Sequence, residues 1–176
     1  MKGFAARASS PGAFYVLLAL LGALSSVLLW VNTPWGIGVG YDSMFYLSAA
    51  GNLVDGLGLS RTDGFGNLIP LTHYPPLYPI ILAFFHWLSG IPVDFVARIL
   101  AAGLIGINVA MIGWLVYRFT GSTLAGGLGA LLAVSSPVLI DVHLMAMSEP
   151  PYLLAILMLL GALFAYLARG DIRTLA

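Results

Sequence analysis

The feature that most constrains this chain is the length of its apolar runs. Residues 13–31, 94–117, 122–140 and 150–168 are almost entirely apolar, and about 20 such residues are needed to cross a bilayer as a helix. The chain is 60% hydrophobic and 8% charged, whereas about a quarter of the residues in soluble domains are charged. The sequence therefore predicts an all-α, polytopic membrane protein with four transmembrane helices.

Composition also excludes several classes of protein. The chain has no Cys, which rules out disulfides and thiolate metal sites. Its net charge is zero and it has no long basic run, so we expect no nucleic-acid partner. No cofactor motif is present, and we expect neither a cofactor nor a metal. The first apolar run is longer than the roughly 7–15 residues of a signal-peptide core, so it is interpreted as a span.

The topology depends on residues 77–88, an apolar segment bounded by prolines and by Ser89-Gly90. A dozen residues are typical of an interfacial helix rather than of a full span. If the segment lies flat, five of the seven Lys and Arg residues are cytoplasmic, and if it crosses, three are. Because cytoplasmic loops carry an excess of Lys and Arg, the flat placement is favoured, with Lys2, Arg7, Arg118, Arg169 and Arg173 inside.

This choice sets the order of segments along the chain. We predict a cytoplasmic N-terminus (1–12), a first span (13–31), an outer loop (32–93) with juxtamembrane helices at about 43–54 and 77–88, a second span (94–117), a cytoplasmic loop (118–121), a third span (122–140), an outer loop (141–149), a fourth span (150–168) and a cytoplasmic tail (169–176). Between the two juxtamembrane helices we expect a Gly-rich loop with turns at 63–64 and 66–67.

Polar residues gather in the predicted outer loops, where function is expected because polar chemistry interrupts apolar sequence. The outer face receives three histidines and six acidic residues: His73, His86, His143, Asp42, Asp55, Asp63, Asp94, Asp141 and Glu149. Asp42 has two compatible interpretations, as the N-cap of the helix that follows or as a carboxylate base at the membrane surface. Glu149 is either an acidic first-turn residue that suits the helix dipole or a functional carboxylate.

The cationic residues have alternatives too. His73 precedes Tyr74-Pro75-Pro76, which forms a rigid turn and points the imidazole toward an anionic head group or, as a weaker alternative, a metal. Arg98 is four residues after Asp94 and is placed for an i,i+4 ion pair or for a lipid phosphate. Arg61 is most simply a solvated loop residue. Among the spans, glycines allow close helix contact, and Asn108 predicts a hydrogen bond between helices.

Four short motifs occur in a familiar order: Gly40-Tyr41-Asp42-Ser43-Met44-Phe45-Tyr46-Leu47, His73-Tyr74-Pro75-Pro76-Leu77-Tyr78-Pro79, Asp94-Phe95-Val96-Ala97-Arg98 and Ser148-Glu149-Pro150. Together they resemble the start of GT-C membrane glycosyltransferases, in particular bacterial transferases akin to protein O-mannosyltransferases and aminoarabinose transferases. The resemblance covers nearly all of the chain. It implies a plasma (inner) membrane protein whose active face points outward.

The resemblance also implies roles for single residues. Asp42 matches the catalytic carboxylate of the first outer loop, and Glu149 is placed across the pocket. His73, Tyr74, Arg98 and Arg61 are expected to bind substrate, with the cations at the phosphate of the donor. The implied partners are a polyprenyl-phosphate sugar donor, the lipid bilayer and a glycan, lipid or protein acceptor.

The chain departs from the family in three ways. Ser43 stands where many relatives have a second acidic residue, Tyr74 stands where some have a Lys, and family members have many more than four spans. We therefore expect an N-terminal portion, a truncated reading frame or a reduced relative that needs a further membrane segment or subunit. The alternative function is a non-catalytic membrane protein or assembly subunit that binds polyprenyl lipids. A transporter fragment comes third, with Asn108 as its clearest polar residue within a span.

Overall fold

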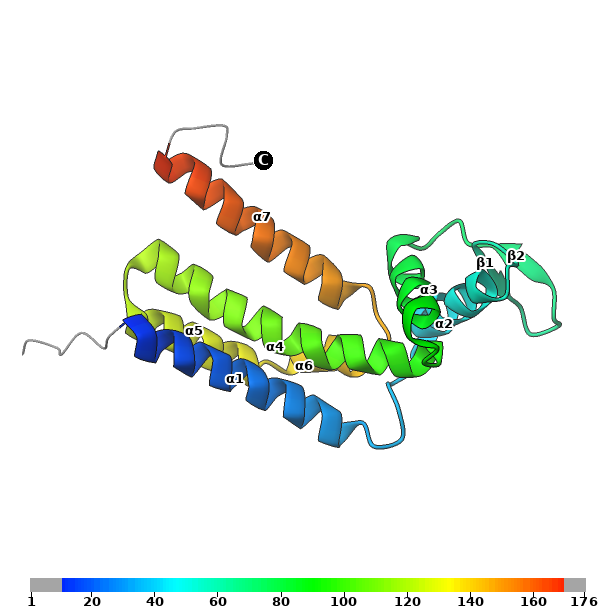
Figure 1. The fold of residues 1–176 in the computed structure, drawn as a ribbon, viewed down its shortest axis with the longest axis horizontal. Coiled ribbons are helices and arrows are strands. Elements are labelled where there is room, and N and C mark those ends of the chain that lie inside the picture. Colours follow the sequence, from blue (N-terminus) through cyan, green and yellow to red (C-terminus); the bar gives the residue numbers. More distant parts are fainter. Residues whose placement is uncertain (1–10, 170–176) are drawn as a thin grey trace, which may run out of the picture.

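A computed structural model describes residues 11–169 (Figure 1). The residues Lys2, Arg7 and Arg173 used in the charge count lie outside this range. The elements in chain order are α1 (Pro11–Asn32), α2 (Tyr41–Val54), β1 (Ser60–Thr62), β2 (Leu68–Pro70), α3 (Leu77–Ser89), α4 (Val93–Thr120), α5 (Thr123–Val134), α6 (Pro137–Leu144) and α7 (Glu149–Arg169). The described chain is mostly helical, which agrees with the predicted all-α class.

By length and composition, three of the described helices can cross a membrane: α1, α4 and α7. A fourth crossing exists if α5 and α6 form one broken span, since they pass the same test together but meet at an angle of 53°. The region predicted as the third span, 122–140, is therefore divided between two helices rather than formed by one. The break precedes Pro137, which lacks an N–H and holds the residue before it out of helical geometry. The Ser136 hydroxyl then caps α6 by accepting the Leu139 N–H at 3.3 Å.

Helix α4 is the centre of the bundle and packs against all six other helices. Glycines allow its closest contacts. A Cβ placed on Gly106 would lie 2.7 Å from the Gly22 carbonyl oxygen of α1, and one on Gly126 of α5 would lie 2.8 Å from the Gly113 carbonyl oxygen. These separations are shorter than any side chain tolerates. The predicted role of the span glycines in close helix packing is confirmed at these positions.

Asn108 of α4 joins α6 to α7. Its side-chain amide donates to His143 Nε2 at 3.0 Å and to the Pro150 carbonyl at 3.1 Å. The other imidazole nitrogen, Nδ1, bonds the Leu139 carbonyl at 2.7 Å, so it carries the proton and Nε2 accepts. The predicted interhelical hydrogen bond is confirmed. The His143 side chain is fully buried within the bundle.

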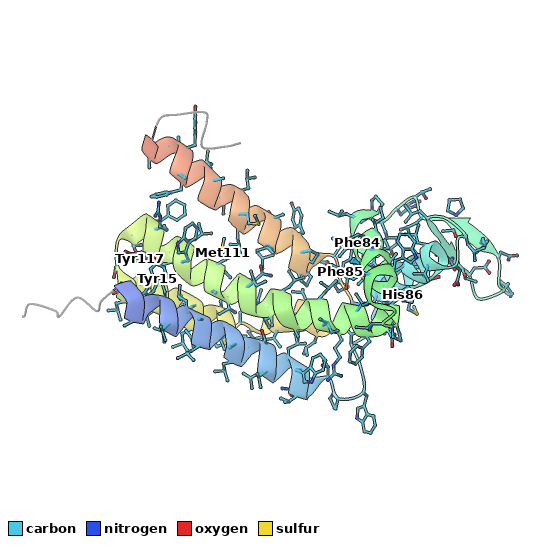
Figure 2. All side chains as sticks on the ribbon, in the orientation of Figure 1. Tyr15, Phe84, Phe85, His86, Met111 and Tyr117 are labelled. Carbon is cyan, nitrogen blue, oxygen red and sulfur yellow. The ribbon has the colours of Figure 1, made fainter. Side chains whose placement is uncertain are left out.

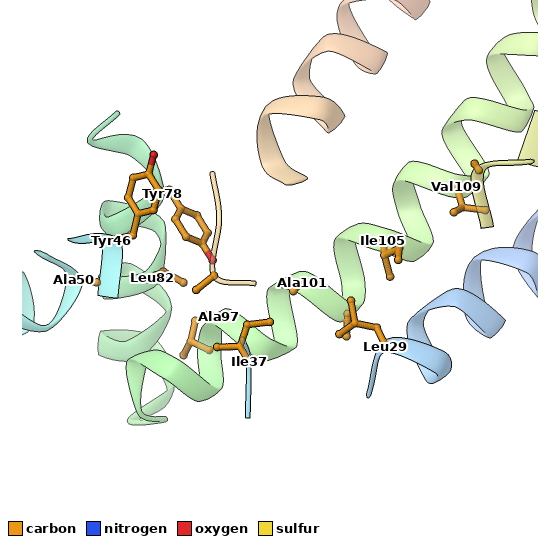
Figure 3. Packing of buried hydrophobic residues seen from close by; sticks show 14 of the residues in the cluster. Leu29, Ile37, Tyr46, Ala50, Tyr78, Leu82, Ala97, Ala101, Ile105 and Val109 are labelled. Carbon is orange, nitrogen blue, oxygen red and sulfur yellow. The ribbon is translucent and has the colours of Figure 1, made fainter. Parts of the chain in front are cut away.

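Residues 41–89 fold into a compact unit at one end of the bundle, here called the platform (Figure 1). Helices form at both positions predicted for the juxtamembrane helices, and α2 begins at Tyr41, two residues before the predicted start. The platform shares its core with the bundle: Figure 3 shows Tyr46 and Tyr78 continuing through Leu82 and Ala97 toward the middle of α4. The platform is therefore fixed to the bundle by apolar packing.

The Gly-rich segment contains a β-hairpin that the sequence analysis missed. Strands β1 and β2 pair antiparallel, with Arg61 opposite Ile69. At its turn the Asp63 carboxylate accepts the backbone N–H groups of Phe65 at 2.9 Å and Asn67 at 2.8 Å. The Asn67 side chain also donates to it at 3.0 Å, and these bonds lower the pKa of Asp63, the side-chain bond most. The predicted turn is thus confirmed, and it lies in a β-hairpin that was not predicted.

Aromatic residues mark both ends of the bundle (Figure 2). At the end away from the platform, the rings of Tyr15 and Tyr117 lie 6.5 Å apart. At the platform end, α3 carries Phe84 and Phe85, which are largely exposed, next to His86. Aromatic side chains are enriched at the two faces of a bilayer, so their positions agree with a bundle that spans one.

Candidate functional site

The chain segments before α2 and before α7 lie side by side. Gly38 donates its N–H to the Leu144 carbonyl at 2.7 Å, and its own carbonyl accepts the Ala146 N–H at 3.0 Å. A side chain at Gly38 would place its Cβ 2.6 Å from the Leu144 oxygen, so this close approach requires glycine. These backbone hydrogen bonds bring the start of α2 next to the start of α7. The two predicted acidic residues, Asp42 and Glu149, therefore lie in the same region.

A cluster of tyrosines joins these two helix starts. The Tyr46 and Ser148 hydroxyls are hydrogen-bonded at 2.9 Å, and the Tyr74 hydroxyl donates to Asp42 Oδ1 at 3.0 Å. The Tyr46 ring lies 5.4 Å from the rings of both Tyr74 and Tyr78, in edge-to-face geometry. We call Tyr46, Tyr74 and Tyr78 the tyrosine cluster.

Asp42 is half-buried in the first turn of α2. It does not cap the helix, because Gly40 occupies the N-cap position and no side chain bonds the first N–H groups there. The capping interpretation is therefore wrong, and the carboxylate is oriented by Tyr74 instead. Its second oxygen, Oδ2, accepts no hydrogen bond from the described residues and is the atom with free lone pairs.

Glu149 is the first residue of α7 and is exposed. Its Oε2 lies 3.4 Å from the Ser148 hydroxyl, which is in turn bonded to Tyr46. Asp42 and Glu149 are both close enough to Tyr46 for their negative charges to raise its pKa. The structure thus brings the two predicted carboxylates together on either side of one tyrosine.

Burial and the carboxylates keep the tyrosine cluster protonated. Burial is the main cause that raises the pKa of Tyr46, partly offset by its bond to Ser148. Burial also raises the pKa of Tyr78 well above its usual range. For Tyr74, loss of hydration and then donation to Asp42 raise the pKa to about 12. All three hydroxyls therefore carry their proton at neutral pH, and Tyr74 donates its own to Asp42.

Arg61 and His73 meet in a pocket of about 320 Å³ between α2 and the segment from β2 to residue 74. The guanidinium Cζ of Arg61 lies 4.7 Å from the centre of the Phe45 ring. His73 is exposed, and its Nδ1 is 3.0 Å from the Thr72 hydroxyl. Tyr74 also lines this pocket, which we call the cationic pocket. The interpretation of Arg61 as a freely solvated loop residue is wrong.

A second hollow lies between α3 and the start of α7. It has a volume of about 350 Å³, and its wall is mostly apolar, with Leu77, Ile81 and Tyr152 among its residues and Glu149 at its edge. We call it the apolar groove. It shares no lining residue with the cationic pocket. The tyrosine cluster borders both, since Tyr74 lines the pocket and Tyr78 the groove.

Arg98 belongs to neither hollow. Its Nε donates to the Thr33 hydroxyl at 3.0 Å and its Nη2 to the Trp30 carbonyl at 2.8 Å, and the guanidinium lies over the Trp30 ring at 3.9 Å. It forms no ion pair with Asp94 among the described contacts, so that prediction is wrong. Arg98 joins α4 to the end of α1 and is largely buried.

No group of three His, Asp or Glu side chains suited to a metal ion occurs within residues 11–169. The polar groups available at the site are two carboxylates, three tyrosine hydroxyls, one serine hydroxyl and, in the neighbouring pocket, one guanidinium and one imidazole. Such a set can accept a proton at Asp42 and donate hydrogen bonds from Tyr74, and it can hold an anion in the cationic pocket.

The tyrosine cluster is not predicted as a functional unit from the sequence. Tyr74 and Tyr78 are four residues apart across a helix start, and Tyr46 is four residues after Asp42, a spacing that places side chains on one helix face. That spacing was the available signal. The Tyr46–Ser148 bond spans 102 positions of the chain, so no local pattern contains it.

Comparisons with protein-family models, with curated proteins and with solved structures found no match to this chain.

Proposed function

We propose that this chain is a multi-pass membrane glycosyltransferase, or the N-terminal catalytic-loop portion of one, with four spans and the platform on the outer face. It would transfer a sugar from a polyprenyl-phosphate donor to a glycan, lipid or protein acceptor. One observation carries the proposal. Asp42 is held with one oxygen free by Tyr74, which lines the polar pocket, while Tyr78 of the same tyrosine cluster lines the apolar groove.

In this reaction Asp42 is the general base. Its free oxygen takes the proton of the acceptor hydroxyl as that oxygen forms a bond to the anomeric carbon. The bond from the anomeric carbon to the phosphate oxygen breaks, and its electron pair leaves with the polyprenyl phosphate. General-base catalysis of this kind contributes roughly 10²–10⁴-fold. Tyr74, which stays protonated at neutral pH, keeps the carboxylate oriented toward the acceptor.

The apolar groove supports a lipid-linked donor. Its wall of Leu77, Ile81 and Ala155 suits an isoprenoid chain, and Glu149 stands at its edge. We place the donor sugar beside the tyrosine cluster, with Glu149 orienting its hydroxyl groups. Arg98 has no part in this proposal, because its hydrogen bonds go to Trp30 and Thr33.

The test compares two aspartates of the same helix region. Membranes that contain the chain are supplied with radiolabelled polyprenyl-phosphate sugars, and transfer to endogenous acceptors is counted. We expect Asp42→Asn to lower turnover by roughly 100-fold or more. Asp55→Asn, an exposed site at the end of α2, should stay within about twofold of the wild-type rate. If Asp42→Asn keeps wild-type turnover, the general-base assignment is wrong.

Topology is tested by cysteine labelling in this cysteine-free chain. Gly90 and Gly121 have positive φ angles of 70° and 68°, which make them poor sites for a side chain. The exposed neighbours Ser89 and Thr120 are better. Ser89→Cys should react with an impermeant maleimide from outside the cell and Thr120→Cys only after permeabilisation. Labelling on the same side for both would contradict the four-span arrangement.

A non-catalytic lipid-binding protein is the other outcome of these experiments. It predicts no transfer by the wild type with any donor, together with retention of polyprenyl phosphate that a bulky residue in the groove, Ala155→Trp, abolishes.

A further inference from the structure

We propose that the cationic pocket binds a small anionic saccharide, meaning a pyranose ring that carries one carboxylate or one phosphate ester. The assignment of this saccharide as the acceptor rests on the proposed function, whereas the binding itself does not. The sequence motifs do not show whether Arg61 and His73 bind the phosphate of the donor or the acceptor. The positions of the two hollows distinguish these alternatives.

Three aromatic rings line the pocket and suit a sugar ring. The rings of Tyr41 and Phe45 lie 4.9 Å apart edge to face, and those of Phe45 and Tyr74 lie 4.8 Å apart at a shallow angle of 33°. All three rings present apolar faces, and the two tyrosines add a polar hydroxyl, which matches the apolar C–H face and the hydroxyl rim of a pyranose. The volume of about 320 Å³ is at the small end of the roughly 300–1,000 Å³ typical of ligand pockets.

Charge selects an anion. Arg61 has its guanidinium over Phe45, and no described carboxylate forms an ion pair with it. A planar guanidinium matches the two oxygens of a carboxylate or phosphate. His73 and the hydroxyl of Thr72 lie on the same pocket wall and add two more hydrogen-bonding groups. No Asp or Glu lines the pocket.

Position assigns the ligand to the acceptor side. The apolar groove lies between α3 and α7, and its lining contains no Lys, Arg or His. The pocket with Arg61 and His73 is built from α2, β1 and residues 69–74. Tyr74, whose hydroxyl bonds Asp42, forms part of its wall. A saccharide in this pocket therefore lies beside the residue that orients Asp42, while the lipid chain of a donor lies in the groove.

Binding is measured by isothermal titration calorimetry on the full chain in lipid nanodiscs, with no donor present. The ligands are glucuronate, glucose 6-phosphate, neutral glucose and inorganic phosphate. We expect at least one anionic sugar to bind about tenfold or more tightly than glucose, the effect of one charge-assisted hydrogen-bonding group. Preference between glucuronate and glucose 6-phosphate identifies which anionic group the pocket takes.

Variants test the residue that carries the charge. Arg61→Gln should weaken binding of the anionic sugar about tenfold or more, whereas Arg61→Lys retains most of it. Arg118→Gln removes an exposed arginine at the other end of α4 and should leave binding unchanged. The comparison of charged and neutral sugars on the wild type needs no variant, so it stands even if Arg61→Gln fails to fold.

Several results would overturn the proposal. Equal binding of glucose and the anionic sugars refutes the role of charge. Binding of inorganic phosphate as tight as that of glucose 6-phosphate refutes the saccharide. No binding of any of the four ligands refutes the site. The proposed function fails separately: binding that persists without any sugar transfer contradicts the enzyme, and transfer that persists without saccharide binding contradicts the pocket.

Discussion

The close contact between α1 and α4 gives the sharpest test of the bundle. Two glycines of α4 are one helical turn apart and differ in what surrounds them. A Cβ on Gly106 would meet the Ser26 hydroxyl and would lie 2.7 Å from the Gly22 carbonyl oxygen, whereas a Cβ on Gly103 meets nothing within 4 Å. Gly103→Ala is thus a matched control for Gly106→Ala, with the same residue change in the same helix.

The expected magnitude follows from this difference. Replacing Gly by Ala within a helix favours the folded state by up to about 1 kcal/mol, and this gain applies to both variants. Only Gly106→Ala must also separate two backbones, and overpacking of this kind costs roughly 1–3 kcal/mol. Because the helix gain cancels in the comparison, Gly106→Ala should be about 1–3 kcal/mol less stable than Gly103→Ala. At roughly 2–4 °C per kcal/mol for a chain of this size, its melting temperature should be about 2–12 °C lower.

The assay is thermal unfolding in detergent, followed by tryptophan fluorescence, with identical conditions for both variants. Gly22→Ala provides the reciprocal change, since its Cβ would lie 2.7 Å from the Gly106 carbonyl oxygen, and it should melt at a lower temperature than Gly103→Ala as well. A melting temperature of Gly106→Ala equal to or above that of Gly103→Ala would refute the packing of α1 against α4 described here.

Further predictions concern the platform and the bundle interior. Tyr46→Phe loses the bond to Ser148 and should lower the free energy of unfolding by about 1 kcal/mol, whereas Tyr41→Phe, at an exposed position, should not. The pKa of Tyr74 is raised from 10 to about 12. The stabilisation that comes from this shift is complete below pH 10 and is lost as the pH rises from 10 to 12. The pKa is measured by titrating tyrosinate absorbance in the wild type and in Tyr74→Phe. Asn108→Leu leaves buried His143 Nε2 without a donor and should destabilise the chain by roughly 1–3 kcal/mol in chemical denaturation.

Much of the fold was predictable because lipid solubility and proline are local signals. The apolar runs gave α1, α4 and α7 to within a few residues, and the prolines around residue 76 gave the short α3. Pro137 is the same kind of local signal, but it lies inside an apolar run that was interpreted as one span, so the bend between α5 and α6 was not predicted. Because hydropathy is averaged over many residues, a single proline changes the average little. The average therefore identifies a span without locating the bend within it.

The site was predictable in part. Asp42 and Glu149 were chosen as polar residues at the ends of apolar segments, and the structure brings both to Tyr46. The partners of Arg98 could not be predicted, because Trp30 and Thr33 come from another helix and the nearby Asp94 offered a simpler pairing. Local spacing favours local partners, and a buried guanidinium is satisfied by whichever oxygens the tertiary packing supplies.

The bond between Tyr46 and Ser148 joins two residues that leave the ribosome at different times. The two hydroxyls are separated by 102 positions, and at about 5–20 residues per second the second emerges roughly 5–20 s after the first. Within that interval α2 and then α3 are completed, whereas the start of α7 comes only at its end. The Tyr46 hydroxyl therefore has no Ser148 partner until the start of α7 has been synthesised, and a chain released before that point lacks both Ser148 and Glu149.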